Sequence, residues 1–257
     1  AMAEPLSKIF TEVLIAPDFD ADALELLMKK PSIRILKCAF TMINPIELRP
    51  VSGGMLLQGT DLIDAHGDLH TPYTTPSGNM HGMPMAISLG IDNKECAVHK
   101  PDSLTLEYWN KLKHIGKICP KVSPDDIVFI SLRDFEKEEK NLLDRLGIKK
   151  ISAKEIRSKG AENIVRSILR YLSDCTDIYL SFDVDCLDAS ISKGTGTPVG
   201  NGLREREAED LVSKFMQNRK ICCFEITEVN PTLDKENLMA EIAFNILQRS
   251  VNILMMN

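Results

Sequence analysis

The chain has 257 residues, of which 44% are hydrophobic and 26% are charged, and its formal net charge is -6. These values are ordinary for a globular protein, and the length suffices for one large α/β domain with a sizeable core. The acidic balance argues against nucleic acid or an anionic membrane as a partner, and no apolar run approaches the ~20 residues that cross a bilayer.

Seven cysteines are present, which is an odd number, and no two of them have C-x-x-C spacing. A disulfide framework is therefore not expected, and reduced thiols in a cytoplasmic protein are the interpretation that fits this usage. Adjacent Cys222 and Cys223 lie in ICCFEIT, which has the composition of a buried strand.

Apolar strand-like segments alternate with amphipathic helical patterns along the chain. In the first part, strands are expected at 12–17 and 32–38 with a helix at 21–30 between them. Further on, strands are expected at 126–134, 177–185 and 221–231, and helices at 161–172, 204–216 and 235–254. Strands that are apolar throughout and alternate with helices predict an α/β fold, a three-layer αβα sandwich around a mostly parallel sheet.

Acidic residues gather directly after the apolar strand-like segments. The groups are Asp64, His66 and Asp68 after Leu62-Ile63; Arg133, Asp134 and Glu136; Asp183, Asp185 and Asp188; and Glu228 with Asn230. Ligands of parallel sheets bind at the carboxyl ends of the strands, which is where these groups fall. So many carboxylates at one edge of a sheet would repel one another unless a cation lies between them.

Two of these groups have alternate spacing, DAHGD at residues 64–68 and DVD at residues 183–185. In an extended strand, residues two apart lie on the same face, so each group could present several ligands together. Either group alone would be an ordinary solvated strand end, but both together with a histidine predict a metal site. Oxygen-rich ligands with one histidine suit Mn²⁺ or a related divalent ion, and carboxylates can bridge two ions ~3.5–4 Å apart.

The segments DAHGDLHTPYTTPSGNMHGMP, SFDVDCLDAS, GTGTP and EVNP follow in order from about residue 61 to the C-terminus. They resemble the arginases of the ureohydrolase family, and SGNMHGMP resembles the arginase version rather than the agmatinase version. The resemblance implies an arginase-like fold and hydrolysis of the linear amidine L-arginine to L-ornithine and urea by a hydroxide that bridges two Mn²⁺ ions. It also implies a role in arginine metabolism, such as the urea cycle, and a homo-oligomer, with a trimer as a common form.

The resemblance also assigns roles to individual residues. The implied metal ligands are Asp64, His66, Asp68, Asp183 and Asp185, of which Asp64 and Asp183 would bridge the ions. The implied substrate-binding residues are His70, Ser77, Asn79, Glu136, Thr197 and Glu228. The implied catalytic residues are Asp68, His81 for proton transfer, and Glu228 for pairing with the guanidinium group. A lone histidine such as His81 is otherwise a core or capping residue.

The chain departs from the family pattern at several positions. His70 stands where the family usually has asparagine, Glu136 where it has aspartate, and Ala189 where it has proline. The family also has a Gly-Gly-Asp-His segment whose histidine binds the same ion as Asp68, whereas this chain has VSGGMLLQGT and no histidine before His66. One ion is therefore expected to bind weakly, and a non-catalytic or weakly active arginase homologue stays open as the alternative.

Residues 12–58 resemble a different family. IAPDF, a double lysine and VSGGMLLQ occur in the order found in the AICAR formyltransferase part of the bifunctional enzyme AICAR formyltransferase/IMP cyclohydrolase. That family's catalytic Lys-His pair lies upstream, and Lys113-His114 is interpreted as a solvated helix end, so a formyl-transfer fragment is only a third hypothesis. We expect one arginase-like domain over 1–257, in which residues 1–60 are a strand-helix-strand segment of different origin that supplies strands to the sheet.

Overall fold

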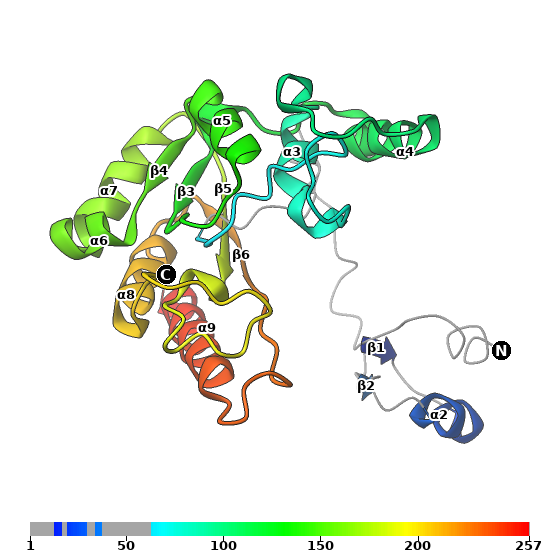
Figure 1. The fold of residues 1–257 in the computed structure, drawn as a ribbon. Helices are drawn as coiled ribbons and strands as arrows, with labels where there is room; N and C mark the ends of the chain where they lie inside the picture. The colour runs from blue at the N-terminus through cyan, green and yellow to red at the C-terminus, as the bar shows by residue number, and fades with distance from the viewer. Residues whose placement is uncertain (1–12, 17–19, 30–33, 38–62, 257) are drawn as a thin grey trace. The chain divides into compact units, whose positions relative to one another are not determined.

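The computed structural model describes residues 13–16, 20–29, 34–37 and 63–256 (Figure 1). The chain divides into two compact units, residues 1–51 and 52–257, which are described here one at a time. In the first unit, strand β1 (Val13–Ala16) pairs in parallel with β2 (Arg34–Lys37), and helix α2 (Ala21–Met28) connects them. These elements match the strand-helix-strand order expected from the sequence. That the whole chain forms one domain stays a prediction.

The second unit is built on a parallel sheet. Its strands are β3 (Val128–Ile130), β4 (Lys149–Ile151), β5 (Ile178–Asp183) and β6 (Ile221–Thr227). Strand β3 pairs with β4, and β5 pairs with β6. Ile63 lies between the two pairs, with parallel bridges to Ile130 and Phe182. The order across the sheet is therefore β4, β3, residue 63, β5 and β6.

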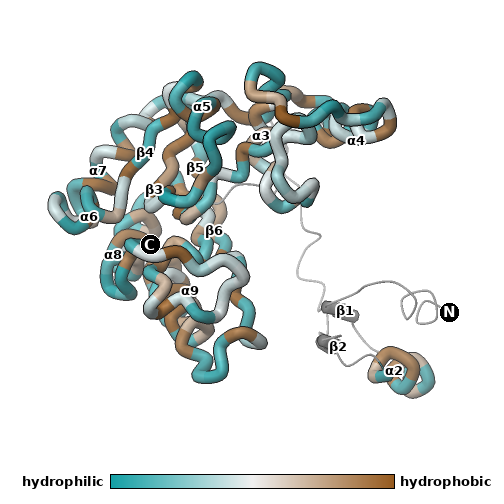
Figure 2. The backbone as a smooth tube through the Cα atoms, viewed as in Figure 1, coloured by the Kyte–Doolittle hydropathy of each residue, from teal (hydrophilic) through white to brown (hydrophobic). Residues whose placement is uncertain are grey.

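One face of this sheet is covered by helices with a single apolar face. They are α6 (Ala153–Lys159), α7 (Ala161–Tyr171), α8 (Glu205–Met216) and α9 (Leu238–Met256). In α7 the buried residues Ile164, Val165 and Ile168 recur at helical spacing and join a core that includes Leu180 and Phe182 of β5. Brown and teal alternate along α7 and α8 in Figure 2, as expected for helices buried on one side.

The opposite face carries α3 (Pro84–Leu89) and α5 (Lys137–Leu146). Phe129 of β3 belongs to the core on this side with Leu142 and Leu143 of α5, whereas Val128 and Ile130 belong to the core on the other side. Alternate residues of β3 thus enter different cores, as a strand covered on both faces requires. Helices, sheet and helices form the three layers, which confirms the predicted αβα sandwich.

The remaining regular elements are short or lie beside these layers. They are α4 (Ser103–Lys113) and the 3₁₀ turns η1 (Met80–Gly82), η2 (Lys94–Cys96), η3 (Ile115–Lys117), η4 (Pro124–Asp126) and η5 (Val184–Cys186). In the part of the chain that the structure describes, no helix combines the length and apolar character needed to cross a membrane.

Several sequence-based expectations about local structure are wrong. The strand expected at 126–134 covers only 128–130, because Ser131 has a φ of 71° and takes the backbone out of the extended region. Strand β6 is not fully buried, since Cys222 is exposed. Lys113 is not a solvated helix end: it is buried, and its Nζ lies 2.5 Å from Asp92 Oδ1. The indole N–H of Trp109 donates to the same carboxylate oxygen at 2.8 Å, so Asp92 holds the end of α4.

Candidate metal centre and substrate cavity

A cavity of about 590 Å³ opens where the chain leaves the sheet after Ile63, β5 and β6. Every residue that the sequence predicts for metal, substrate or catalysis lines it: Asp64, His66, Asp68, His70, Ser77, Asn79, His81, Glu136, Asp183, Asp185, Thr197 and Glu228. The roles of these residues stay predictions, but the tertiary structure brings them to one place.

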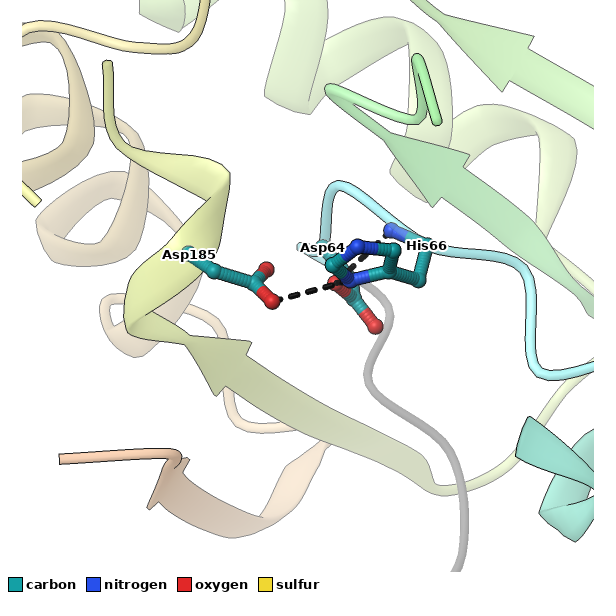
Figure 3. Close-up of side chains that lie close together, drawn as sticks. All are labelled: Asp64, His66 and Asp185. Carbon is teal, nitrogen blue, oxygen red and sulfur yellow. Dashed lines mark hydrogen bonds and ion pairs between the residues drawn. The ribbon is translucent and has the colours of Figure 1, made fainter. Parts of the chain in front are cut away.

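Three of these side chains meet at what we call the inner group, Asp64, His66 and Asp185 (Figure 3). One ligand atom from each lies within 4.8 Å of the others. His66 Nδ1 is 2.9 Å from Asp185 Oδ2 and 3.5 Å from Asp64 Oδ1. Both carboxylates are buried, whereas the imidazole is partly exposed. The group therefore offers two oxygens and one nitrogen to a single point.

Backbone and hydroxyl groups fix the orientation of these carboxylates. The N–H of His66 donates to Asp64 Oδ1 at 2.9 Å, and the N–H of Ala65 donates to Asp185 Oδ1 at 3.2 Å. The hydroxyl of Thr197 donates to Asp185 Oδ2 at 3.2 Å. Such outer contacts hold metal ligands in place and tune their basicity, so the inner group is arranged as a ligand set would be.

The local backbone differs from the extended strands expected here. Asp68 has a left-handed φ of 52°, and Asp185 lies in the turn η5, with its N–H donating to Asp183 Oδ1 at 2.8 Å. The alternate spacing therefore does not place these side chains through a strand, and that interpretation is wrong. Beyond the strand end the N–H groups lack ladder partners, so an aspartate carboxylate accepts them and closes a turn. The convergence comes from these turns.

The side chains of the inner group change one another's pKa values. Burial by itself would lower the pKa of His66, but hydrogen bonds to Asp185 and Asp64 outweigh burial and raise that pKa to about 11. Burial raises the pKa of Asp64 well above its usual range. Burial would also raise the pKa of Asp185, but hydrogen bonds with His66, Asp64 and Asp183 and the charge of His66 together outweigh burial and lower that pKa to about 2. These buried carboxylates hold a positive charge between them. A divalent cation fits the same oxygens, and His66 would then be neutral.

A second set of side chains, which we call the outer group, consists of His70, Glu136 and Glu139. His70 Nε2 is 2.9 Å from Glu136 Oε2 and 3.5 Å from Glu139 Oε2. Burial, together with the neighbouring Glu136, raises the pKa of Glu139 to about 8. Sequence reasoning missed Glu139, although its position three residues after Glu136 is the capping-box spacing that begins α5.

The other predicted residues are on exposed segments. Ser77, Asn79 and His81 lie in the loop that ends in η1, and all three are exposed. Glu228 is also exposed and has a left-handed φ of 60° directly after β6. A strained conformation at a cavity-lining residue is typical of functional positions. The cavity thus has a buried end at the inner group and an exposed, loop-built end.

Arg133 supports the inner group from behind, a role that the sequence analysis did not assign. Its guanidinium donates to the carbonyl oxygens of Asp185 at 2.8 Å, Leu187 at 3.0 Å and Val199 at 2.8 Å. It also donates to the carbonyl oxygen of Ser131 at 3.0 Å. Arg133 therefore ties the segment after β3 to the loop that carries Asp185 and lies between β5 and α8. The fixed, planar set of donors in arginine suits this multiple contact.

The segment that stands in place of the family's first histidine, residues 51–60, lies outside the residues that the structure describes.

For the first part of the chain, a family model described as AICARFT/IMPCHase bienzyme matches residues 1–89, which confirms the second resemblance. A formimidoylglutamase structure from Bacillus subtilis, with a TM-score of 0.56 at 23% identity over 74% of this chain and 51% of that one, shares the fold.

The larger part of the chain matches arginases. An arginase of Brevibacillus brevis is 36% identical over 74% of this chain and 58% of its own length, and human arginase-1 is 37% identical over 69% and 52%. The crystal structure of Bacillus subtilis arginase has a TM-score of 0.63 at 34% identity, covering 73% of this chain and 60% of that one. The chain thus spans less than two thirds of these relatives. Because the model of the Arginase family matches residues 62–251, the chain belongs to the arginase family.

Proposed function

We propose that this chain hydrolyses L-arginine to L-ornithine and urea with manganese bound at the inner group. The observation that carries the proposal is the convergence of Asp64, His66 and Asp185 ligand atoms within 4.8 Å of one another in a cavity. The arginase family membership of this part of the chain and its similarity to arginases support the substrate. The chain covers only part of those relatives, so the activity is a proposal for this chain itself.

The donor set fits a binuclear centre. Asp64 and Asp183 would be shared by two ions, His66 and Asp185 would complete the first, and Asp68, which lines the same cavity, would belong to the second. Oxygen ligands with a single imidazole suit Mn²⁺. What such ions supply, when bound, is activation of a water molecule at neutral pH. The protein contributes the orientation of the carboxylates through Ala65, Thr197 and Arg133.

The charge of the cavity favours a cationic substrate. The described residues that line it include no lysine or arginine, while carboxylates lie at both ends. Exposed Glu228 would accept hydrogen bonds from a guanidinium group, a pairing whose planar geometry can be bidentate. Glu136 would face the α-amino group, and exposed Ser77 and Asn79 would bind the α-carboxylate. His81, exposed in η1, would transfer a proton.

We also infer the cellular compartment of the protein and its assembly. The cysteines in the described part of the chain are free, which supports a reducing compartment such as the cytoplasm. We keep the homo-oligomer, with the trimer as its form, as an expectation from the family resemblance.

The test is metal analysis and product measurement on the purified full chain loaded with Mn²⁺. We expect about two ions per chain with unequal affinity, because no histidine stands at the family's first ligand position. Ornithine and urea should form only at high added Mn²⁺ and more readily at alkaline pH. Agmatine, which lacks the carboxylate that Ser77 and Asn79 would bind, should be a poor substrate. Asp183→Asn should lose both metal and activity.

A matched control is Asp177→Asn, since Asp177 directly precedes β5 at the opposite end from Asp183. It should keep metal content and activity. Absence of bound manganese and of product in the unmodified chain would support the alternative, a non-catalytic homologue. Equal turnover of L-arginine and agmatine would overturn the assigned substrate while leaving the hydrolase intact.

A further inference from the structure

We propose that His99 is a positioning residue: from outside the substrate cavity, it fixes the loop of residues 75–79 that would bind the α-carboxylate of L-arginine. The role of Ser77 and Asn79 in this loop rests on the proposed function. His99 lies shortly before α4, and its Nε2 is 2.8 Å from the carbonyl oxygen of Thr75. A carbonyl oxygen only accepts hydrogen bonds, so Nε2 carries the proton and donates it.

Backbone hydrogen bonds attach the His99 segment to the same part of the chain. The N–H groups of Val98 and His99 both donate to the carbonyl oxygen of Tyr73, at 2.8 Å and 2.9 Å. With the imidazole, three donors of this segment therefore bind the chain where it enters the substrate loop. Because its backbone is held in this way, His99 has only its side-chain torsions to order when it donates to Thr75.

The loop that His99 holds is a wall between two cavities. Thr75, Pro76 and Ser77 line the substrate cavity, and they also line a neighbouring cavity of about 860 Å³. His99 lines the second cavity and not the first. A side chain in that place does not touch a substrate in the first cavity, so His99 would act on the substrate only through Thr75.

The orientation of Thr75 determines where the substrate-binding residues lie. Thr75 is buried, and its hydroxyl oxygen accepts the N–H of Gly78 at 3.0 Å. Gly78 has a left-handed φ of 75°, which lets the chain turn sharply at this point. Within the same turn, the hydroxyl oxygen of Ser77 accepts the N–H of Asn79 at 3.2 Å. A rotation of the Thr75 backbone would therefore move Ser77 and Asn79.

The other end of the loop has an anchor of its own. The N–H of His70 donates to the carbonyl oxygen of Gly82 at 2.9 Å. This bond holds the end of η1, the turn that contains His81, to which proton transfer is assigned. Loss of the His99 imidazole should therefore loosen the carboxylate-binding part of the loop and leave His81 in place. The expected effect is on KM rather than on kcat.

The kinetic test compares His99→Ala and His99→Gln in the full chain loaded with Mn²⁺. In His99→Ala, KM for L-arginine should rise roughly 2–10-fold, the range for loss of one hydrogen bond, while kcat stays nearly constant. The glutamine amide offers a donor close to the position of Nε2, so His99→Gln should restore KM. An unchanged KM in His99→Ala would overturn the proposal. Equal weakening of agmatine hydrolysis would also overturn it, because agmatine has no carboxylate for the loop to bind.

The matched control is His114→Ala. His114 is exposed at the end of α4, and its Nδ1 lies 2.7 Å from the carbonyl oxygen of Asn110, so it too bonds a backbone carbonyl through its imidazole. It lines neither of the two cavities. KM and kcat should therefore stay as in the unmodified chain.

A second measurement does not depend on activity. Hydrogen exchange followed by mass spectrometry reports on the amide groups of residues 75–79, among them the Gly78 N–H that Thr75 binds. Exchange in this segment should be at least about twofold faster in His99→Ala than in the unmodified chain, and unchanged in His114→Ala. Equal exchange in all three chains would overturn the proposal even in an active enzyme. Faster exchange in a chain without activity would support the role of His99 while the proposed function fails.

Discussion

The inner and outer groups have the same composition, one imidazole and two carboxylates, but the backbone holds them differently. The inner carboxylates follow Ile63 and β5, come from segments about 120 residues apart, and are buried. The outer carboxylates come from the N-cap and the first turn of a single helix, α5, and one of them is half exposed. The comparison shows that the sheet brings carboxylates from distant segments together, whereas the start of a helix presents two carboxylates that are neighbours in the sequence.

The electrostatics follow the same division. In the inner group, interactions with His66, Asp64 and Asp183 together outweigh burial and lower the pKa of Asp185 to about 2. In the outer group, burial prevails and raises the pKa of Glu139 to about 8. The inner group is therefore arranged around the charge of His66, whereas in the outer group burial favours the protonated form of Glu139.

The largest effect is expected from Asp185→Asn. Asp185 accepts hydrogen bonds from Ala65 and Thr197 and pairs with His66, so an amide removes charge where several contacts depend on it. Manganese affinity and hydrolysis should each fall by more than about 100-fold, since the loss of a ligand exceeds the 10–100-fold of outer contacts. Metal analysis and product assays measure both. Normal metal content would contradict the assignment of Asp185 as an inner ligand, and Asp177→Asn again serves as the control.

The next largest effect concerns the hydrogen bonds by which Arg133 holds the backbone of the inner group. Arg133→Lys removes donors from the carbonyl oxygens of Asp185, Leu187 and Val199, and lysine cannot reproduce the planar set. The free energy of unfolding in urea should fall by about 2–3 kcal/mol, because buried acceptors lose charged donors. Arg166→Lys on the surface of α7 is the control and should stay within about 0.5 kcal/mol.

A smaller effect is expected at the exposed end of the cavity. Ser77→Ala removes one hydroxyl from an exposed loop, and a single hydrogen bond contributes about 0.5–1.5 kcal/mol, or roughly 2–10-fold in binding. KM for L-arginine should rise within that range while kcat stays nearly constant. Steady-state kinetics measure it, with Ser158→Ala in α6 as the control. A large fall in kcat would show that the loop belongs functionally with the inner group.

The smallest effect is expected for a carboxylate outside the cavity. Hydrogen bonds from Lys140 and Lys150 lower the pKa of Asp144 to about 2, although the Asp144 side chain is half exposed. Because its pKa is lower in the folded state, its contribution to stability is present above about pH 4 and is lost as pH falls towards 2. Asp144→Asn should therefore change the melting temperature by no more than about one degree at pH 7, and not at all near pH 2. A larger change at pH 7 would contradict the expectation that an ion pair at an exposed carboxylate contributes little to stability.

The sequence by itself determined the fold class and the acidic residues that meet at the edge of the sheet. Apolar strands alternating with helices predicted a parallel sheet with helices on both faces, because a strand such as β3 can be apolar throughout only when both faces are covered. Acidic residues after the strands predicted a shared edge, because parallel strands end on the same side. Both inferences rest on local pattern and connectivity, which a sequence carries. The resemblance to arginases then supplied the residue roles.

Only the tertiary structure decided how these residues are held. Asp185 reaches the inner group from the turn η5 rather than from a strand, and Glu139 enters the cavity while it caps α5. Arginine and lysine are usually surface residues. Here Arg133 ties two loops together, and Lys113 is buried against Asp92. These outcomes depend on carbonyl and carboxylate partners that are distant along the chain, and a local pattern contains no record of which distant group will accept a hydrogen bond.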